Sequence, residues 1–274
     1  MTDSRPVGIF DSGVGGLTVA RSIIDLLPGE SIRYVGDTAR CPYGPRPFDE
    51  VRGFATEIVD WLHGQDVKLV IAACNTATAA AVVNDPVPFP VKVIGVIEPS
   101  VRAALARTHT GSIGVIGTEG TINSGVYERL LHDMAGERPL TVTSQASPEF
   151  VTFAEQGRTN DAEVLSVARN VLAPLIAAQV DTLILGCTHY PLLTGMIGHV
   201  MGPDVALISS AEMTARAVFS YMVTHDLLAP EHTDVQRAFY TTGDTGSFIS
   251  LAQRFLGPRI NRADVDHMAT QERA

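Results

Sequence analysis

Short apolar runs alternate along the chain with longer segments whose apolar residues recur every three to four positions. The runs are rich in Val, Ile and Leu and end in Gly, Pro or small polar residues, which is typical of strands buried on both faces of a parallel sheet. Their alternation with helical segments predicts an α/β fold. Strands are predicted at residues 7–10, 32–35, 69–73, 91–96, 112–117 and 182–186, and helices at 17–27, 48–64, 77–83, from 98 onward and at 211–223.

One combination of strand, cysteine and helix occurs twice. Cys74 follows one apolar run, and Cys187 follows a similar run 113 residues later; small polar residues and a helical segment come after each. Gly8 and Gly114, in the first strand of each half, are 106 residues apart. Because the two offsets are so similar, we infer an internal duplication. Each cysteine is then expected at the carboxyl end of a buried strand, where open α/β sheets bind ligands.

The duplication predicts two parallel-sheet α/β lobes. We assign residues 1–97 and 210–274 to the first lobe and residues 98–209 to the second. The stretch at 239–243 is expected to return to the first lobe. The tail after Pro258 is polar, and we expect it to be poorly ordered.

Composition excludes several classes of protein. The 274 residues are 45% hydrophobic and 18% charged, and the net charge is −10. An acidic chain of this kind is not expected to bind nucleic acid directly, because phosphate contacts need clustered Lys and Arg. No apolar run reaches the roughly 18 residues that a membrane span needs, and the opening residues lack a signal core. Three cysteines without CxxC spacing indicate a reduced, cytoplasmic setting rather than a disulfide framework.

The cysteines have a structural interpretation and a chemical one. A single Cys at the end of a buried strand is usually a small core residue. The repeated placement favours chemistry, because both Cys74 and Cys187 precede capping residues, and the start of a helix favours the thiolate form. Two opposed thiols could remove a proton from one face of a carbon and return one to the other face, which inverts a stereocentre.

Other uses of the two thiols fit less well. A disulfide oxidoreductase would use CxxC, and a zinc site would obtain only three ligands, from Cys74, Cys187 and His189. A thiol hydrolase needs one nucleophile rather than two symmetrical thiols. Lys68 and Lys92 are the only lysines, and neither is placed as the Schiff-base lysine of a pyridoxal phosphate enzyme. We therefore expect no cofactor and no metal.

Several polar residues near the predicted strand ends keep two interpretations. The Gly-rich turn at 13–16 could bind a phosphate, although Thr18 stands where the third Gly of a dinucleotide loop belongs. Asp11 and Ser12 could form only a helix cap. The remaining residues with both interpretations are Asp37 and Tyr43, which could be turn residues, and Thr118 and Thr121, which could line a cleft or cap a helix.

Four motifs carry a resemblance to a known family. Residues 8–17 (GIFDSGVGGL), 37–44 (DTARCPYG), 73–77 (ACNTA) and 185–192 (LGCTHYPL) resemble the signatures of glutamate racemases, members of the cofactor-independent aspartate/glutamate racemase superfamily. The matches run in the family's order from residue 8 to about residue 246. Cys41 stands where that family does not require cysteine, so we expect it to be a spectator. The histidines at 63, 109 and 132 are expected at the surface.

The resemblance implies a fold and a reaction. It implies two lobes related by a pseudo-twofold axis, with the active site in the cleft between them. The implied reaction interconverts L- and D-glutamate and supplies D-glutamate for bacterial peptidoglycan. It also implies a cytoplasmic homodimer, and DNA gyrase as a secondary partner, since some family members restrain gyrase. An aspartate or hydantoin racemase, and a non-catalytic binding protein, remain the alternatives.

The resemblance also implies roles for individual residues. Cys74 would exchange the α-proton of the D-enantiomer and Cys187 that of the L-enantiomer, with Asp11 and His189 assisting. The implied substrate contacts are Asp11, Ser12, Tyr43, Gly44, Asn75, Thr76, Thr188 and His189. Hydroxyls, amides and N–H groups at helix starts suit an anionic substrate, so an arginine clamp is not required.

Overall fold

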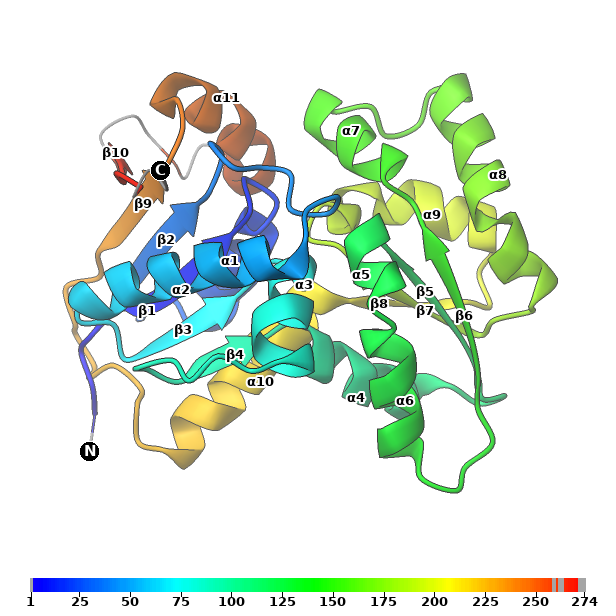
Figure 1. The fold of residues 1–274 in the computed structure, drawn as a ribbon, viewed down its shortest axis with the longest axis horizontal. Coiled ribbons are helices and arrows are strands. Elements are labelled where there is room, and N and C mark those ends of the chain that lie inside the picture. The colour runs from blue at the N-terminus through cyan, green and yellow to red at the C-terminus, as the bar shows by residue number, and fades with distance from the viewer. Residues whose placement is uncertain (1, 258–259, 261–263, 271–274) are drawn as a thin grey trace.

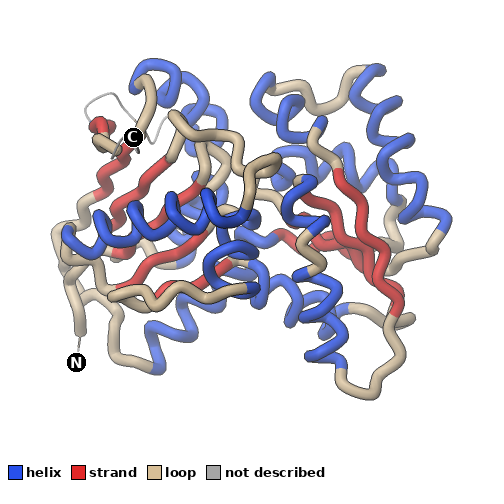
Figure 2. The backbone as a smooth tube through the Cα atoms, viewed as in Figure 1, coloured by secondary structure: helices blue, strands red, loops and turns tan. Residues whose placement is uncertain are grey.

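Two parallel β-sheets, each covered by helices, make up the molecule (Figure 1). The computed structural model describes residues 2–257, 260 and 264–270. One sheet has six strands in the order β10-β9-β2-β1-β3-β4, and the other has four in the order β6-β5-β7-β8. We call the six-stranded sheet with its helices the first lobe and the four-stranded sheet with its helices the second lobe. Figure 2 shows the two sheets side by side with helices on their faces.

The elements follow one another as the sequence predicts, with several additions. In the first half of the chain they are β1 (Val7–Asp11), α1 (Leu17–Leu26), β2 (Ile32–Gly36), α2 (Phe48–Gly64), β3 (Leu69–Ala72), α3 (Asn75–Thr78), the π-helical segment η1 (Ala79–Asn84), β4 (Val93–Gly95), α4 (Ile97–Arg107), β5 (Ser112–Gly117), α5 (Glu119–Asn123) and α6 (Val126–Ala135). In the second half they are β6 (Thr141–Ala146), α7 (Glu149–Gln156), α8 (Ala162–Ala177), β7 (Thr182–Gly186), the 3₁₀ segment η2 (Tyr190–Leu193), α9 (Thr194–Met201), β8 (Ala206–Ser209), α10 (Ser210–Thr224), β9 (Arg237–Thr241), α11 (Thr245–Leu256) and β10 (Val265–His267).

The duplication extends to the register of the strands. The order β2-β1-β3-β4 in the first sheet repeats as β6-β5-β7-β8 in the second. Gly8 of β1 pairs with Val70 of β3, and Gly114 of β5 pairs with Leu183 of β7. These pairs are related by the same offsets, 106 and 113, that the sequence shows. The predicted fold class, with two parallel α/β lobes, is therefore confirmed.

The central strands are buried on both faces, as their apolar runs predict. Every residue of β1, β3 and β7 is buried. Helices cover the sheets and close the hydrophobic cores, and α10 packs against both α1 and α4. The strands at 7–95 and 237–267 lie in the first sheet, and those at 112–209 lie in the second. No helix among the described residues is long and apolar enough to cross a membrane.

Three predicted elements need correction. The helix predicted at 77–83 begins at Asn75 and widens into the π-helical η1, and the strand predicted at 91–96 is limited to β4. The tail was expected to be poorly ordered, but β10 pairs in parallel with β9 and extends the first sheet. Residues 260 and 268 are buried Ile and Met, so apolar side chains anchor this segment. The other tail residues, 258–259, 261–263 and 271–274, lie outside the described residues.

Candidate active site

The two cysteines occupy equivalent places in the two lobes. Cys74 lies at the carboxyl end of β3 and Cys187 at the carboxyl end of β7, and each is 6% exposed. Cys187 is among the groups that act electrostatically on Cys74, although burial and the charge of Asp11 have larger effects. The carboxyl ends of parallel strands are where an α/β sheet exposes functional side chains. Each lobe therefore contributes one thiol at the equivalent strand end.

Side chains from each lobe hold the segment that follows the other lobe's cysteine. Thr18 of α1 donates its hydroxyl hydrogen bond to the carbonyl oxygen of Thr188, at 2.9 Å. Tyr127 of α6 donates to Asn75 Oδ1, at 2.7 Å. Thr76 Oγ1 lies 3.0 Å from Thr118 Oγ1, and the Thr118 side chain also caps α5. The cap interpretation of Thr118 is therefore confirmed, and the same hydroxyl also contacts the opposite lobe.

Cys74 is surrounded mainly by neutral groups. Its sulfur accepts a hydrogen bond from the N–H of Ala77 at 3.4 Å, and its thiol lies 3.6 Å from Ser12 Oγ. Burial, and then the negative charge of Asp11, raise the pKa of Cys74 to about 12. The N–H of Ala77 at the helix start lowers the pKa of Cys74, in the direction that the sequence predicts, but burial raises this pKa by more.

Cys187 lies beside a cation instead. Its sulfur is 3.8 Å from Nδ1 of His189, and Nε2 of His189 is 3.0 Å from Glu155 Oε1. Burial lowers the pKa of His189, but its hydrogen bonds to Cys187 and Glu155 and the charge of Asp11 outweigh burial and raise the pKa to about 10. The imidazolium therefore persists at neutral pH and places a positive charge beside the Cys187 sulfur. Glu155 was not predicted from the sequence, where no motif marks it.

The Gly-rich turn allows the lobes to approach at this point. A Cβ atom on Gly15 would lie 2.4 Å from Thr188 Oγ1 and 2.5 Å from His189 Nδ1, so no side chain fits there. In a phosphate loop, the space beside this glycine would be open to the ligand. Here that space is filled by Thr188 and His189. This packing explains the Gly at position 15 without a nucleotide.

Asp11 lies between the two sulfur environments. It is fully buried, and its Oδ2 accepts a hydrogen bond from the N–H of Gly13 at 3.0 Å. Burial raises its pKa, against the lowering effects of His189 and of the N–H groups of Gly16 and Gly13. Thr188 Oγ1 lies 3.5 Å from Asp11 Oδ1. Asp11 is thus a buried carboxylate that an additional cation would stabilise.

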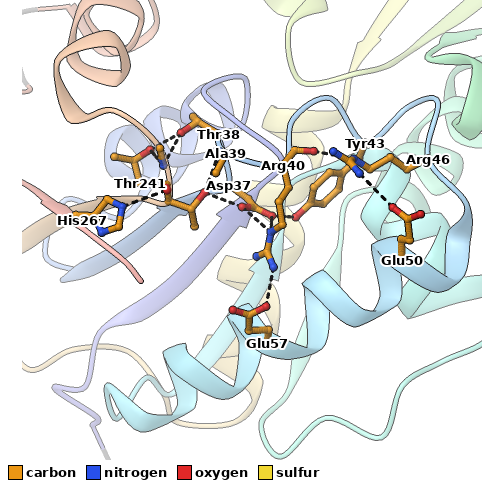
Figure 3. Close-up of polar contacts among 12 residues, drawn as sticks. Asp37, Thr38, Ala39, Arg40, Tyr43, Arg46, Glu50, Glu57, Thr241 and His267 are labelled. Atoms are coloured by element: carbon orange, nitrogen blue, oxygen red, sulfur yellow. Dashed lines mark hydrogen bonds and ion pairs between the residues drawn. The ribbon is translucent and has the colours of Figure 1, made fainter. Parts of the chain in front are cut away.

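Two predicted substrate contacts differ in how much of their hydrogen-bonding capacity is already used. Asn75 is 3% exposed, and its Nδ2 has no hydrogen-bond partner among the described residues. Such an amide is expected to meet a ligand, since buried donors are normally paired. Tyr43, by contrast, donates its hydroxyl to the buried carboxylate of Asp37, which Arg40 and Thr242 also contact (Figure 3). The Tyr43 hydroxyl is therefore committed within the first lobe.

Residues around Tyr43 bring the same loop to the second lobe. The α-carbon of Gly44 approaches Thr118 so closely that a Cβ atom would lie 3.1 Å from the threonine Cβ. A Cβ on Gly120 would lie 2.4 Å from the carbonyl oxygen of Gly44. A cavity of about 300 Å³ lies at this rim and is lined by Gly44, Thr118 and Glu119. Asp37 is thus more than a turn residue, because it anchors the loop that reaches the cleft.

The remaining candidates lie away from the two sulfurs or at the edge of the site. Cys41 is half-buried, and burial, together with nearby carboxylates, raises its pKa to about 12. Lys68 is buried against Glu30 before β3, and Lys92 lies over the ring of Tyr221 before β4. The histidines at 63, 109 and 132 are exposed, as predicted. Within residues 2–257, 260 and 264–270, no group of three or more His, Cys, Asp or Glu is placed to hold a metal ion.

Comparison with known proteins decides the family. A profile of the Asp/Glu/hydantoin racemase family matches residues 13–218. The chain belongs to the Asp/Glu/hydantoin racemase family. Within it, the glutamate racemase of Corynebacterium diphtheriae is 50% identical over 262 residues, covering 96% of this chain and 98% of the relative. The resemblance identified from the four motifs is confirmed, and the chain is an isomerase.

Solved racemases of the family share the whole architecture. Glutamate racemase RacE1 from Bacillus anthracis superimposes with a TM-score of 0.89 at 43% identity and covers 98% of both chains. Glutamate racemase from Francisella tularensis, solved in complex with D-glutamate, has a TM-score of 0.87 at 32% identity and covers 97% of this chain and 98% of its own. The two-lobed racemase fold therefore extends over nearly the full chain.

Proposed function

We propose that this chain interconverts L- and D-glutamate by proton transfer at Cα, with two thiols as the acid/base pair and with no cofactor or metal. The observation that carries the proposal is the placement of Cys74 and Cys187 at equivalent register positions of two lobes. The relatives named glutamate racemases, one of them solved with D-glutamate, support glutamate as the substrate. D-glutamate would serve peptidoglycan synthesis in a bacterial cell.

Glutamate would bind between the lobes through groups that suit an amino acid with two carboxylates. The unpartnered Nδ2 of Asn75 is a donor for a carboxylate, and the hydroxyls of Ser12, Thr76 and Thr188 can donate as well. The substrate ammonium would pair with Asp11, whose raised pKa returns toward its ordinary value when a cation arrives. Tyr43 and Gly44 would contribute main-chain groups, because the Tyr43 hydroxyl is already bonded to Asp37.

The charge distribution sets the order of the proton transfers. In the L-to-D direction, the Cys187 thiolate removes the α-proton and becomes a thiol. Cys74, whose raised pKa keeps it protonated, gives its proton to the opposite face of the carbanion and becomes a thiolate. His189 stabilises the Cys187 thiolate before the reaction. N–H groups at the start of α3 would stabilise charge that develops on the substrate carboxylate. The D-to-L direction is the reverse sequence.

The cellular setting and the assembly follow from the same proposal. The enzyme would act in the cytoplasm as a homodimer, with residues 1–97 and 210–274 as one domain and 98–209 as the other. DNA gyrase would be a secondary protein partner, without direct contact between this acidic chain and nucleic acid.

Replacement of each thiol tests the mechanism. Cys74→Ser and Cys187→Ser should each lower the rate of racemisation, followed by circular dichroism of the amino acid, by about 10³-fold or more. A single remaining thiol can still remove and return a proton on its own face. In deuterated water, Cys74→Ser should therefore exchange the α-hydrogen of L-glutamate and Cys187→Ser that of D-glutamate, both without inversion.

Two controls make this test decisive. Cys41→Ser should racemise glutamate at the wild-type rate, because Cys41 is not a member of the pair. The double variant Cys74→Ser/Cys187→Ser should exchange no α-hydrogen while keeping the wild-type far-ultraviolet spectrum. Exchange by the double variant would refute the two-thiol mechanism, and faster turnover of aspartate than of glutamate by the wild type would refute the substrate assignment.

A further inference from the structure

A single tyrosine of the second lobe contacts the segments beside both cysteines. Tyr127 lies in the first turn of α6 and is 2% exposed. Its hydroxyl donates to Oδ1 of Asn75, the residue directly after Cys74, at 2.7 Å. Its ring lies over Gly186, the residue directly before Cys187, where a Cβ atom would come within 3.1 Å of Tyr127 Cε2. No sequence motif singled out this residue.

The hydrogen bond to Tyr127 determines which end of the Asn75 carboxamide faces the site. A carboxamide has an acceptor end and a donor end, and rotation by 180° exchanges them. The Tyr127 hydroxyl donates to Asn75 Oδ1, and because burial raises the pKa of the phenol, it keeps the proton that it donates. The acceptor end of Asn75 is therefore held against Tyr127, and the donor end, Nδ2, is left without a partner among the described residues.

We propose that Tyr127 is a positioning residue that keeps the NH₂ group of Asn75 directed at a carboxylate of the substrate. Without the tyrosine hydroxyl, the amide can rotate and place its oxygen opposite the carboxylate, which is repulsive. The inference rests on the proposed function, because it takes glutamate as the ligand of the cleft. It adds to that function a role for Tyr127 of the opposite lobe, which ensures that Asn75 presents its NH₂ group, and not its oxygen, to the substrate.

The ring of Tyr127 has a second role in the same device. It packs against Gly186, next to the Cys187 segment, while its hydroxyl reaches the Asn75 segment. The side chain thus connects the end of β7 to the start of α3. Tyr127→Phe should keep this packing and remove only the hydrogen bond, which separates the orienting role from the packing role.

The first experiment measures steady-state kinetics of Tyr127→Phe with each enantiomer of glutamate. KM should rise by about 10- to 100-fold, as for loss of a hydrogen bond to a charged group, with kcat nearly unchanged. In an Asn75→Ala background, Tyr127→Phe should cause no further loss, because the amide that it orients is gone. An unchanged KM in Tyr127→Phe, or full additivity of the two substitutions, would overturn the proposal.

Tyr190→Phe is the matched control. It removes a buried hydroxyl that donates to the carbonyl oxygen of Ser147 at 2.8 Å within the second lobe. Its effect on KM, of whatever size, should add fully to that of Asn75→Ala. Equal non-additivity in this control would show that the coupling of Tyr127 reflects general loosening, and would overturn the proposal.

Asn75→Asp provides an independent test with Tyr127 intact. Tyr127 would hold one carboxylate oxygen, and the other would place a negative charge opposite the substrate carboxylate. KM should therefore rise more in Asn75→Asp than in Asn75→Ala, and an equal or smaller rise would contradict the assigned amide orientation. The wild type is assayed first: if it does not racemise glutamate, the proposed function fails, whereas an active wild type with an unaffected Tyr127→Phe sinks only this inference.

Discussion

The two halves of the active site share a backbone arrangement and differ in charge. In both, a strand with the same register ends in a cysteine that is 6% exposed. Cys74 has a hydroxyl and one N–H group beside its sulfur, and burial raises its pKa to about 12. Cys187 has the imidazolium of His189 at 3.8 Å, held from behind by Glu155. Equivalent geometry therefore places the two sulfurs in different electrostatic surroundings.

One aligned position accounts for most of this difference. At the offset of 113 residues, His189 corresponds to Thr76. The Thr76 hydroxyl contacts Thr118 and Thr121 of the opposite lobe, at 3.0 and 3.2 Å, and carries no charge. Duplication therefore supplies two matching positions for the sulfurs, whereas side chains that differ between the halves place a cation beside Cys187 and neutral groups beside Cys74.

Removing the imidazolium should make the two halves alike. His189→Asn should lower kcat/KM for glutamate by about 10²-fold at neutral pH, because the Cys187 thiolate loses its cation. A buried thiol without a nearby cation resists ionisation, so kcat/KM of the variant should climb as the pH is raised from 7 to 9 while that of the wild type stays level. Initial rates across this range, followed by circular dichroism, measure the difference.

The direction of the reaction cannot reveal this asymmetry. L- and D-glutamate have equal free energies, so kcat/KM must fall by the same factor in both directions. The pH profile is therefore the informative readout. His63→Asn, at an exposed position of α2, is the control and should match the wild type. A level pH profile in His189→Asn would show that the imidazolium does not set the charge of Cys187.

The same histidine should link folding stability to pH. Its pKa in the folded chain is about 10, above its ordinary 6.5, so the folded state holds the proton more tightly. Its contribution to stability is complete below pH 6.5 and is lost as pH rises toward 10. The raised pKa of Cys74 adds a loss of the same sign only above pH 9. The free energy of unfolding in urea should thus fall between pH 6.5 and 9 in the wild type and fall less in His189→Asn. Parallel curves would contradict this assignment.

The sequence was sufficient to predict the strands of both lobes and the positions of the two cysteines. Apolar runs identified the buried strands, and the repeated cysteine after such a run placed one sulfur at a strand end in each lobe. The offsets of Gly8 and Gly114 predicted the shared register, since these residues lie where a helix side chain packs directly on the strand.

The electrostatics could not be predicted, because they depend on residues distant in sequence. Glu155 lies 34 residues before His189, and Tyr127 lies 52 residues after Asn75. A helix start after Cys74 suggested a thiolate, but burial and the charge of Asp11 raise the pKa of this thiol by more than the helix N–H lowers it. The strand β10 could not be predicted for a similar reason, because it forms by pairing with β9, whose edge is exposed only in the folded sheet.

Gly8 and Gly114 occupy equivalent strand positions in the two lobes. Substitution of either should therefore lower the stability of the folded protein in the same way, unlike substitutions beside the two sulfurs. A Cβ on Gly8 would lie 3.1 Å from Val70 and 3.4 Å from Leu62, and one on Gly114 would lie 3.0 Å from Leu183 and 2.8 Å from Leu175. Gly8→Ala and Gly114→Ala should each destabilise the protein by about 1–3 kcal/mol through overpacking, with the larger effect at Gly114, where the approach is closer.

Urea unfolding measures these changes, and Gly29→Ala is the control because no atom lies within 4 Å of its added Cβ. The folded molecules of both variants should racemise glutamate with the wild-type pH dependence, since neither glycine touches the sulfurs. If only one of the pair were destabilised, the two sheets would pack their helices differently despite the shared register. The likeness of the two lobes would then be confined to the strands, and the symmetry of the site would rest on the sheets alone.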